Sequence, residues 1–282
     1  MHPPDRELAI AAAAAGAAVV RAAFGAPLTR HDKGAGDFAT AADLDAERAI
    51  LAVLHEARPA DAIVGEESGA SGSGPRRWLV DPLCGTLNFA AGTMAVAVNV
   101  ALRDGGRTTT AAVADPFTGE IFWTAGDGAF VRPAGAGPSL TPPPPTPADL
   151  PLIPSAATGL VDVNLDPPYP IDQALALLAA PSFAGRFRPR VLSTTLALTW
   201  VATGRRAAYV TGGDLRDSVH FAAGLAVCEA AGCVVTALDG SPLHSGDGVL
   251  AAADEEAHAA LLAMLTREKA AQPPVDDAQK LS

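Results

Sequence analysis

The stretch Asp81-Pro82-Leu83-Cys84-Gly85-Thr86-Leu87-Asn88-Phe89 follows directly on the apolar run Trp78-Leu79-Val80. The apolar run predicts a buried β-strand, and the proline and glycine after it predict that the strand ends there. A carboxylate, a thiol, a hydroxyl and an amide are therefore placed at one strand end. Because strand ends are where α/β proteins collect binding and catalytic groups, this stretch predicts a functional site.

The composition is that of a globular chain of one large or two small domains. It has 282 residues, of which 49% are hydrophobic and only 5% aromatic, which suits small side chains packed between helices and sheets. The net charge of −11 disfavours nucleic acid and anionic membranes as partners. The three cysteines are too few and odd in number for a disulfide framework, and the N-terminus resembles neither a signal peptide nor a membrane span. We therefore expect a cytoplasmic protein.

The order of the expected elements divides the chain into two halves. Residues 5–24 and 40–57 read as helices, and several short strands between 62 and 131 indicate a meandering sheet with both helices on one face. A segment rich in proline, glycine and alanine, 133–154, is the best boundary. Beyond it strands and helices alternate. We expect an N-terminal α+β half with the metal site (1–140), a C-terminal α/β half (141–271) and a loose polar tail (272–282).

Four separate segments supply candidate site residues: Asp43 at the head of the second helix, Gly65-Glu66-Glu67-Ser68 after a short strand, Asp81 to Asn88, and Asp214 to Gly224, which contains His220 and opens a helix from Asp217. Taken singly, each has an ordinary explanation as a helix-start charge, a solvated turn, a core histidine or a small buried thiol. Their joint order favours function. Carboxylates at strand ends, followed by a helix N-terminus, are what hard divalent cations and phosphates require.

Together these segments resemble the inositol monophosphatase family over nearly the whole chain. The family signature Asp-Pro-x-Asp-Gly-Thr-x-Asn reads here with Cys84 in place of its second aspartate. The resemblance implies an α/β layered sandwich (α-β-α-β-α) of the sugar-phosphatase type, with a mostly antiparallel N-terminal sheet. It also implies a homodimer that hydrolyses a small phosphorylated metabolite with divalent metal ions, usually Mg²⁺.

By position, the resemblance implies that Glu66, Asp81 and the Leu83 carbonyl hold a first metal ion. Thr86 and Asp43 would orient or activate the attacking water. Gly85, Thr86 and the segment Ser193-Thr194-Thr195 would bind the substrate. All of these ligand and water-activating side chains are present.

The second metal of the family is held by the shared aspartate and two further aspartates, which are Cys84 and His220 in this chain. Thiolate and imidazole are poor Mg²⁺ ligands but are good ligands for softer ions. Asp81, Cys84 and His220 could therefore hold Zn²⁺, with Mn²⁺ as another option.

Three interpretations remain open at this point. In the first, the protein is a metal-dependent hydrolase of a phosphorylated polyol or sugar with an altered second metal site. In the second, Cys84 is a nucleophile with His220 as its base, its thiol pKa lowered by a helix N-terminus, and the chemistry is not that of a phosphatase. In the third, catalysis is lost and the chain is a binding or regulatory homologue. The proposed site depends on Cys84 and His220 meeting in one pocket beside Asp81.

Overall fold

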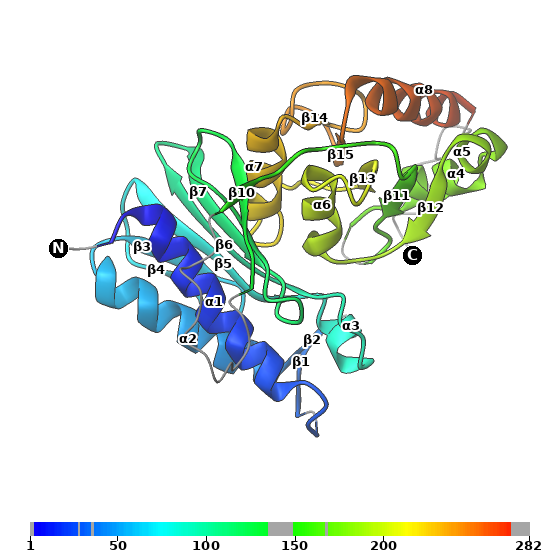
Figure 1. Ribbon diagram of the computed structural model, residues 1–282. Coiled ribbons are helices and arrows are strands. Elements are labelled where there is room, and N and C mark those ends of the chain that lie inside the picture. Colours follow the sequence, from blue (N-terminus) through cyan, green and yellow to red (C-terminus); the bar gives the residue numbers. More distant parts are fainter. Residues whose placement is uncertain (1–2, 28, 35–36, 135–148, 167–168, 272–282) are drawn as a thin grey trace, which may run out of the picture.

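The computed structural model describes residues 3–27, 29–34, 37–134, 149–166 and 169–271 (Figure 1). The expected tail, 272–282, and most of the expected boundary segment, 135–148, lie outside these residues. The division into two halves therefore stays a prediction. Among the described residues, no helix combines the length and the apolar composition that crossing a membrane would require.

The first sheet has eight strands in the order β10-β9-β8-β7-β6-β5-β3-β4. Its neighbours pair antiparallel except β3 and β5, which are parallel. The strands are β3 (Ala62–Gly65), β4 (Gly69–Ser71), β5 (Arg76–Cys84), β6 (Ala97–Asp104), β7 (Arg107–Ala114), β8 (Ile121–Thr124), β9 (Ala129–Arg132) and β10 (Leu150–Pro151). The sequence placed a strand near 152–155 in the C-terminal half, and the structure instead has β10, which pairs with β9 of this sheet. A separate hairpin joins β1 (Arg30–Gly34) to β2 (Asp37–Thr40).

The second sheet has five strands in the order β12-β11-β13-β15-β14. The strands are β11 (Leu160–Val163), β12 (Arg188–Val191), β13 (Ala208–Thr211), β14 (Val234–Thr236) and β15 (Val249–Ala252). The pairs β11–β12 and β11–β13 are parallel, and β15 runs antiparallel to both β13 and β14. This mixed pattern is consistent with the expected alternation of strands and helices.

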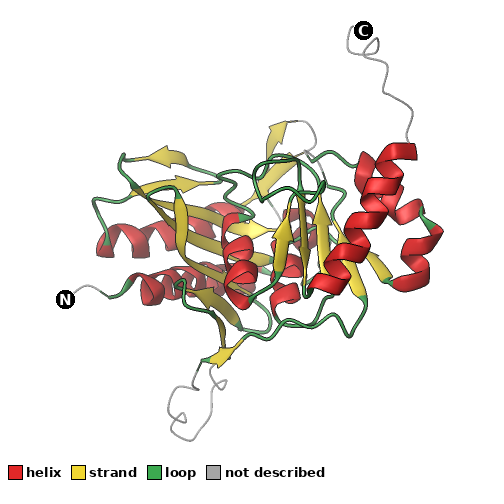
Figure 2. Ribbon diagram, turned by 90° about the horizontal axis from the view of Figure 1, so that it is seen from above, coloured by secondary structure: helices red, strands yellow, loops and turns green. Residues whose placement is uncertain are grey.

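The helices form three layers around the two sheets (Figures 1 and 2). They are α1 (Asp5–Ala23), α2 (Ala41–Ala57), α3 (Thr86–Ala90), α4 (Asp172–Ala179), α5 (Pro181–Arg186), α6 (Thr195–Ala202), α7 (Ala222–Ala231) and α8 (Glu255–Ala271). One apolar core joins α1 and α2 to the outer face of the first sheet, a second joins α6 and α7 to both sheets, and a third joins α4, α5 and α8 to the second sheet. The arrangement is the expected α-β-α-β-α sandwich.

The central layer explains how distant segments reach one site. Helices α6 and α7 are nearly apolar all round, as expected of helices buried between two sheets, and Leu198 and Val227 are fully buried. They lie between the sheets in Figure 1. Both helices begin near the ends of β3 and β5. They therefore bring residues from later in the chain to that end of the first sheet.

Candidate functional site

Two acidic residues stand side by side at the ends of the parallel strands β3 and β5. Gly65 pairs with Val80 in the register, so the residues that follow them, Glu66 and Asp81, are neighbours. The backbone N–H of Glu66 donates to the carbonyl of Val80 at 3.0 Å. The pairing of the strands thus makes neighbours of the two residues whose carboxylates the resemblance assigns to a first metal.

The Asp81 carboxylate is fully buried and is held by three groups. Its Oδ1 accepts from the Leu83 N–H at 3.1 Å, and its Oδ2 accepts from the Asn99 amide at 3.2 Å. The Nδ1 atom of His220 lies 2.9 Å from the same Oδ2. A buried carboxylate with these partners is fixed in orientation before any ligand arrives.

Cys84 and His220 meet beside Asp81, as the sequence predicted. One ligand atom from each of the three residues lies within 4.8 Å of the others. Asp81 is buried, Cys84 is half-buried, and the side chain of His220 is 35% exposed. The cluster is therefore open to solvent on the histidine side, through which an ion or a substrate could enter.

His220 does not lie where the sequence placed it along its element. The helix expected from Asp217 begins only at Ala222. Asp217 has a positive φ of 56°, which a right-handed helix does not allow, and it forms an ion pair with Arg103. His220 therefore stands in the turn before α7, from which its ring reaches Asp81.

The environment of Cys84 holds its thiol in the protonated form. Burial and the nearby Asp81 carboxylate raise the pKa of Cys84 well above its usual value. The Thr195 N–H at the start of α6 does donate to Cys84 Sγ, at 3.3 Å, and this contact acts in the opposite direction. Burial outweighs it, so the lowered thiol pKa expected for a Cys84 nucleophile is not found.

Asp43 and Thr86, to which the resemblance assigns the attacking water, form a hydrogen-bonded pair. Thr40 caps α2 and forms a reciprocal capping box with Asp43, whose Oδ2 accepts from the Thr40 N–H at 2.8 Å. The other oxygen, Oδ1, lies 3.0 Å from the Thr86 hydroxyl, which is also 3.2 Å from the Leu83 carbonyl. Burial raises the pKa of Asp43, although its bonds to Thr40 and Thr86 partly oppose the shift.

Gly85 makes the turn that brings Leu83 and Thr86 together. Its φ of 99° is left-handed, and a side chain there would lie 3.0 Å from the Ala95 carbonyl. Any residue other than glycine would be strained by this backbone conformation, even if its side chain had room. This turn bends the chain from β5 into α3 and aims the Leu83 carbonyl at the Thr86 hydroxyl.

The segment Ser193–Thr195 reaches the site but uses its hydroxyls internally. Ser193 Oγ donates to Asn164 Oδ1 at 2.5 Å, and the Ser193 carbonyl accepts from Asn88 Nδ2 at 3.0 Å. Thr194 caps α6. The Thr195 hydroxyl accepts from Asn99 at 2.8 Å. These bonds tie the second half of the chain to the signature stretch, and contact of the segment with a substrate stays a prediction.

Asn99 is a residue of the site that sequence reasoning missed. It faces Asp81 across β5 and β6, is fully buried, and donates from one amide nitrogen to both Asp81 and Thr195. Its Oδ1 has no hydrogen-bond partner within the described part of the chain. The signal was a lone amide in an otherwise apolar run, Val96 to Leu102, because such a buried polar group needs partners.

Glu47 and Tyr169 are two further residues beside the candidate site. Glu47 is buried and accepts from the N–H groups of Glu67 and Ser68, each at 2.8 Å. It therefore holds the turn that carries Glu66.

Tyr169 comes from the later part of the chain. Its pKa is raised, mainly by burial and secondarily by the nearby Cys84. Its ring packs edge-on against Phe221 with centroids 5.4 Å apart, and no sequence pattern indicated it.

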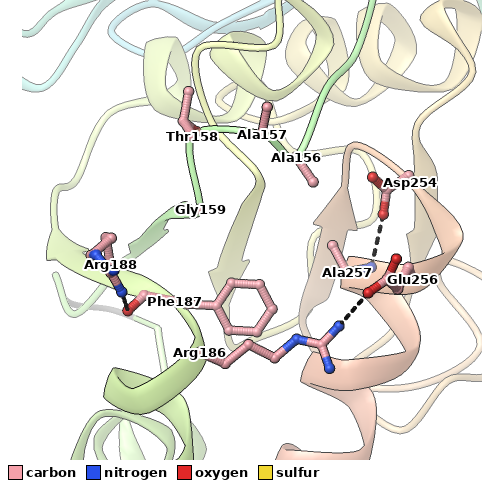
Figure 3. Close-up of a pocket in the computed structure, with 10 residues that line it drawn as sticks. All are labelled: Ala156, Ala157, Thr158, Gly159, Arg186, Phe187, Arg188, Asp254, Glu256 and Ala257. Atoms are coloured by element: carbon pink, nitrogen blue, oxygen red, sulfur yellow. Dashed lines mark hydrogen bonds and ion pairs between the residues drawn. The ribbon is translucent and has the colours of Figure 1, made fainter.

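A cavity of about 460 Å³ lies elsewhere, between β11, β12 and the start of α8 (Figure 3). Arg186 and Arg188 are on its wall, and Arg186 forms an ion pair with Glu256 at 2.9 Å. None of the predicted site residues lines it. It opens at the amino ends of β11 and β12, whereas ligands of α/β sheets bind at the carboxyl ends. We assign the site to the Asp81 cluster.

A model of the inositol monophosphatase family matches residues 3–270 of the chain. The inositol-1-monophosphatase ImpA of Mycolicibacterium smegmatis is 32% identical over 235 residues, which cover 78% of each protein. A glucose-1-phosphate thymidylyltransferase of Streptomyces griseus is 42% identical over only 114 residues, 39% of this chain and 44% of that protein. The chain thus spans less than half the length of some curated relatives and about three quarters of others.

Solved structures share the fold over almost the full chain. The extragenic suppressor protein SuhB from Bartonella henselae superposes with a TM-score of 0.78 at 24% identity, covering 93% of this chain and 98% of its own. SuhB of Mycobacterium tuberculosis gives a TM-score of 0.70 at 28% identity, with coverages of 95% and 97%. The layered sandwich is therefore common to all three chains.

Proposed function

Because the chain belongs to the inositol monophosphatase family, we propose that it is a metal-dependent phosphatase that hydrolyses a monophosphate of a small polyol or sugar. The observation that carries this proposal is the meeting of Asp81, Cys84 and His220 at the end of β5. Beside them stand Glu66 and the Thr86–Asp43 pair. These residues supply the water-activating groups and the candidate metal ligands that the proposal requires.

The donor atoms divide into two sets that suit different ions. Glu66, Asp81 and the Leu83 carbonyl offer only oxygen, which suits Mg²⁺. Asp81, Cys84 and His220 offer oxygen, sulfur and nitrogen, which suits Zn²⁺. Ligand atoms on one tetrahedral zinc stand about 3.3–3.8 Å apart, so the observed spread of up to 4.8 Å needs only small side-chain rotations.

When bound, such ions supply positive charge against the phosphate oxygens and the leaving oxygen. The protein itself moves the proton. The Thr86 hydroxyl oxygen can take a proton from an attacking water while its own proton passes to Asp43 Oδ1, 3.0 Å away. The raised pKa of Asp43 makes that carboxylate a better proton acceptor than an exposed one.

The remaining parts of the proposal concern binding. We assign contact with the substrate phosphate to Gly85, Thr86 and the segment Ser193–Thr195 at the start of α6, because backbone N–H groups at a helix start favour anions. The partner is a small phosphorylated metabolite, and the homodimer implied by the resemblance is part of the same proposal. The Cys84 nucleophile is less well supported because the thiol pKa is raised rather than lowered.

The test is phosphate release from inositol and sugar monophosphates in the presence of Mg²⁺, Mn²⁺ or Zn²⁺. We expect turnover with at least one ion, and a loss of about 100-fold in Asp81→Asn, since removal of metal charge costs several kcal/mol of barrier. Asp45→Asn is the matched control, because Asp45 is an exposed carboxylate on α2 paired with Arg48. Failure to release phosphate from any ester with any of the three ions would contradict the proposal.

A further inference from the structure

The two cysteines away from the site, Cys228 and Cys233, lie at the end of α7. Gly232 follows the last helical residue with a left-handed φ of 88°. The Cys233 N–H donates to the Cys228 carbonyl at 3.0 Å, and the Gly232 N–H donates to the Glu229 carbonyl at 3.1 Å. These two bonds define a Schellman motif, which closes a helix by a reversed pair of hydrogen bonds.

This motif brings the two cysteines close together. Its first and last residues normally make an apolar contact, and here both are cysteines, near enough for Cys233 to raise the pKa of Cys228. The 3.0 Å bond between their backbones also limits the separation of their Cα atoms to about 7 Å, given standard bond lengths. That limit coincides with the upper end of the range that a disulfide spans.

Both cysteines are free thiols, and Cys228 is hydrogen-bonded to a helix of the central layer. Cys228 is fully buried and Cys233 is 9% exposed. Cys228 Sγ donates to the Leu198 carbonyl of α6 at 3.3 Å. The contact with Cys233 and burial raise the pKa of Cys228. Cys228 therefore lies where α7 touches α6.

We propose that Cys228 and Cys233 form a redox-active dithiol that small disulfides convert reversibly into an intramolecular disulfide. The thiolate of Cys233, the more exposed of the two, attacks one sulfur of the small disulfide and releases one small thiolate. Cys228 then attacks the sulfur of Cys233 in the mixed disulfide and releases the second small thiolate. Two protons and two electrons leave the protein, and the oxidant is reduced to two thiols.

This modification site is separate from the metal-ligand cluster. Cys84 contacts Thr195 and Asp81 in the site, whereas Cys228 and Cys233 contact each other at the opposite end of α7. Because Cys228 is buried, the reaction requires fraying of the last helical turn, which is where helices fray first. Oxidation is therefore slow and depends on the pair rather than on either thiol alone.

The test uses oxidised glutathione on the native, metal-free protein, followed by thiol counting after denaturation and by peptide mass mapping. Free thiols should fall from three to one, with a peptide carrying a Cys228–Cys233 link and Cys84 still free. In Cys228→Ser the remaining Cys233 should carry a glutathione adduct and form no link. Dithiothreitol should restore three thiols.

Either of two results would overturn the proposal. One is that Cys228 and Cys233 both stay free after prolonged exposure, whether or not Cys84 reacts. The other is that each carries its own glutathione and no link forms. The wild-type chain alone decides between these results and the expected one, so a variant that fails to fold does not affect the outcome. Since nothing here measures phosphate release, failure of the phosphatase proposal leaves this test unchanged.

Discussion

Asp81 belongs to two proposed sets of ligands with different donor atoms, called its two sides below. The oxygen side consists of the Glu66 carboxylate and the Leu83 carbonyl, and the other side consists of Cys84 and His220, which offer sulfur and nitrogen and which the structure brings together with Asp81. Both sides are supported by hydrogen bonds: Glu47 holds the turn of Glu66, and Thr195 donates to Cys84. Under the proposed assignment, softer donors replace one half of an oxygen-ligand site while the shared carboxylate keeps its place.

The variant with the largest expected effect gives both sides the same kind of donor atom. In the double variant Cys84→Asp/His220→Asp the second set becomes oxygen only. We expect its affinity for Zn²⁺ to fall by about 100-fold or more and its turnover with Mg²⁺ to rise, because Mg²⁺ prefers carboxylate oxygen to sulfur. Isothermal titration and phosphate release measure the two effects. Unchanged zinc affinity would show that Cys84 and His220 are not ligands.

A second variant removes the support that both sides share. Asn99→Ala deletes the amide that donates to Asp81 and to Thr195. Loss of such a supporting partner typically lowers metal affinity or activity by about 10–100-fold. We expect both ions to bind more weakly by this amount. Asn164→Ala is the matched control, since that buried asparagine bonds Thr211 and Ser193 and does not touch Asp81. Equal zinc affinity in Asn99→Ala and the wild type would refute the positioning role.

The reactivity of Cys84 tests the sulfur side alone. Because burial and Asp81 raise the thiol pKa, the reactive thiolate is scarce near neutral pH and increases only as the pH rises toward that value. We expect alkylation by iodoacetamide in the metal-free protein to be at least about tenfold slower at pH 7 than for an exposed cysteine. The rate should climb steadily with pH. Fast alkylation at neutral pH would restore the nucleophile hypothesis.

The smallest effect concerns the oxygen side alone. In Gly65→Ala the new methyl group would lie 2.7 Å from the Glu47 carboxylate, which must move and loosen the turn that carries Glu66. Overpacking of this kind costs about 1–2 kcal/mol, visible as a lower midpoint of chemical denaturation. Mg²⁺ binding should weaken while zinc affinity stays unchanged. Zinc affinity that falls in parallel would show that the two sides are not independent.

Different features of the sequence predicted the layers of the fold and the cluster of Asp81, Cys84 and His220. Periodicity identified the first two helices, and Thr40 was recognisable as the cap of α2 from residue type alone. The meeting of Cys84 and His220 followed only from the family resemblance, since 136 positions separate them in the sequence and no local pattern links them.

What the sequence could not predict depends on long-range contacts. The delayed start of α7 arises from Asp217, whose ion pair with Arg103 lies outside its own segment. The role of Asn99 depends on the register between β5 and β6, which an apolar pattern does not specify at the level of single partners. Tyr169 lies beyond the predicted boundary segment and packs against Phe221, a contact that no local pattern indicates.

The absorption spectrum of the cobalt-loaded protein tests most directly whether Asp81, Cys84 and His220 hold one soft ion. Co²⁺ takes the tetrahedral sites of zinc and reports a sulfur ligand by an intense thiolate-to-cobalt band. We predict that band in the wild type, its disappearance in Cys84→Ser, and its displacement by one equivalent of Zn²⁺. A cobalt spectrum without a sulfur band, or one that Cys84→Ser leaves unchanged, would contradict the assignment.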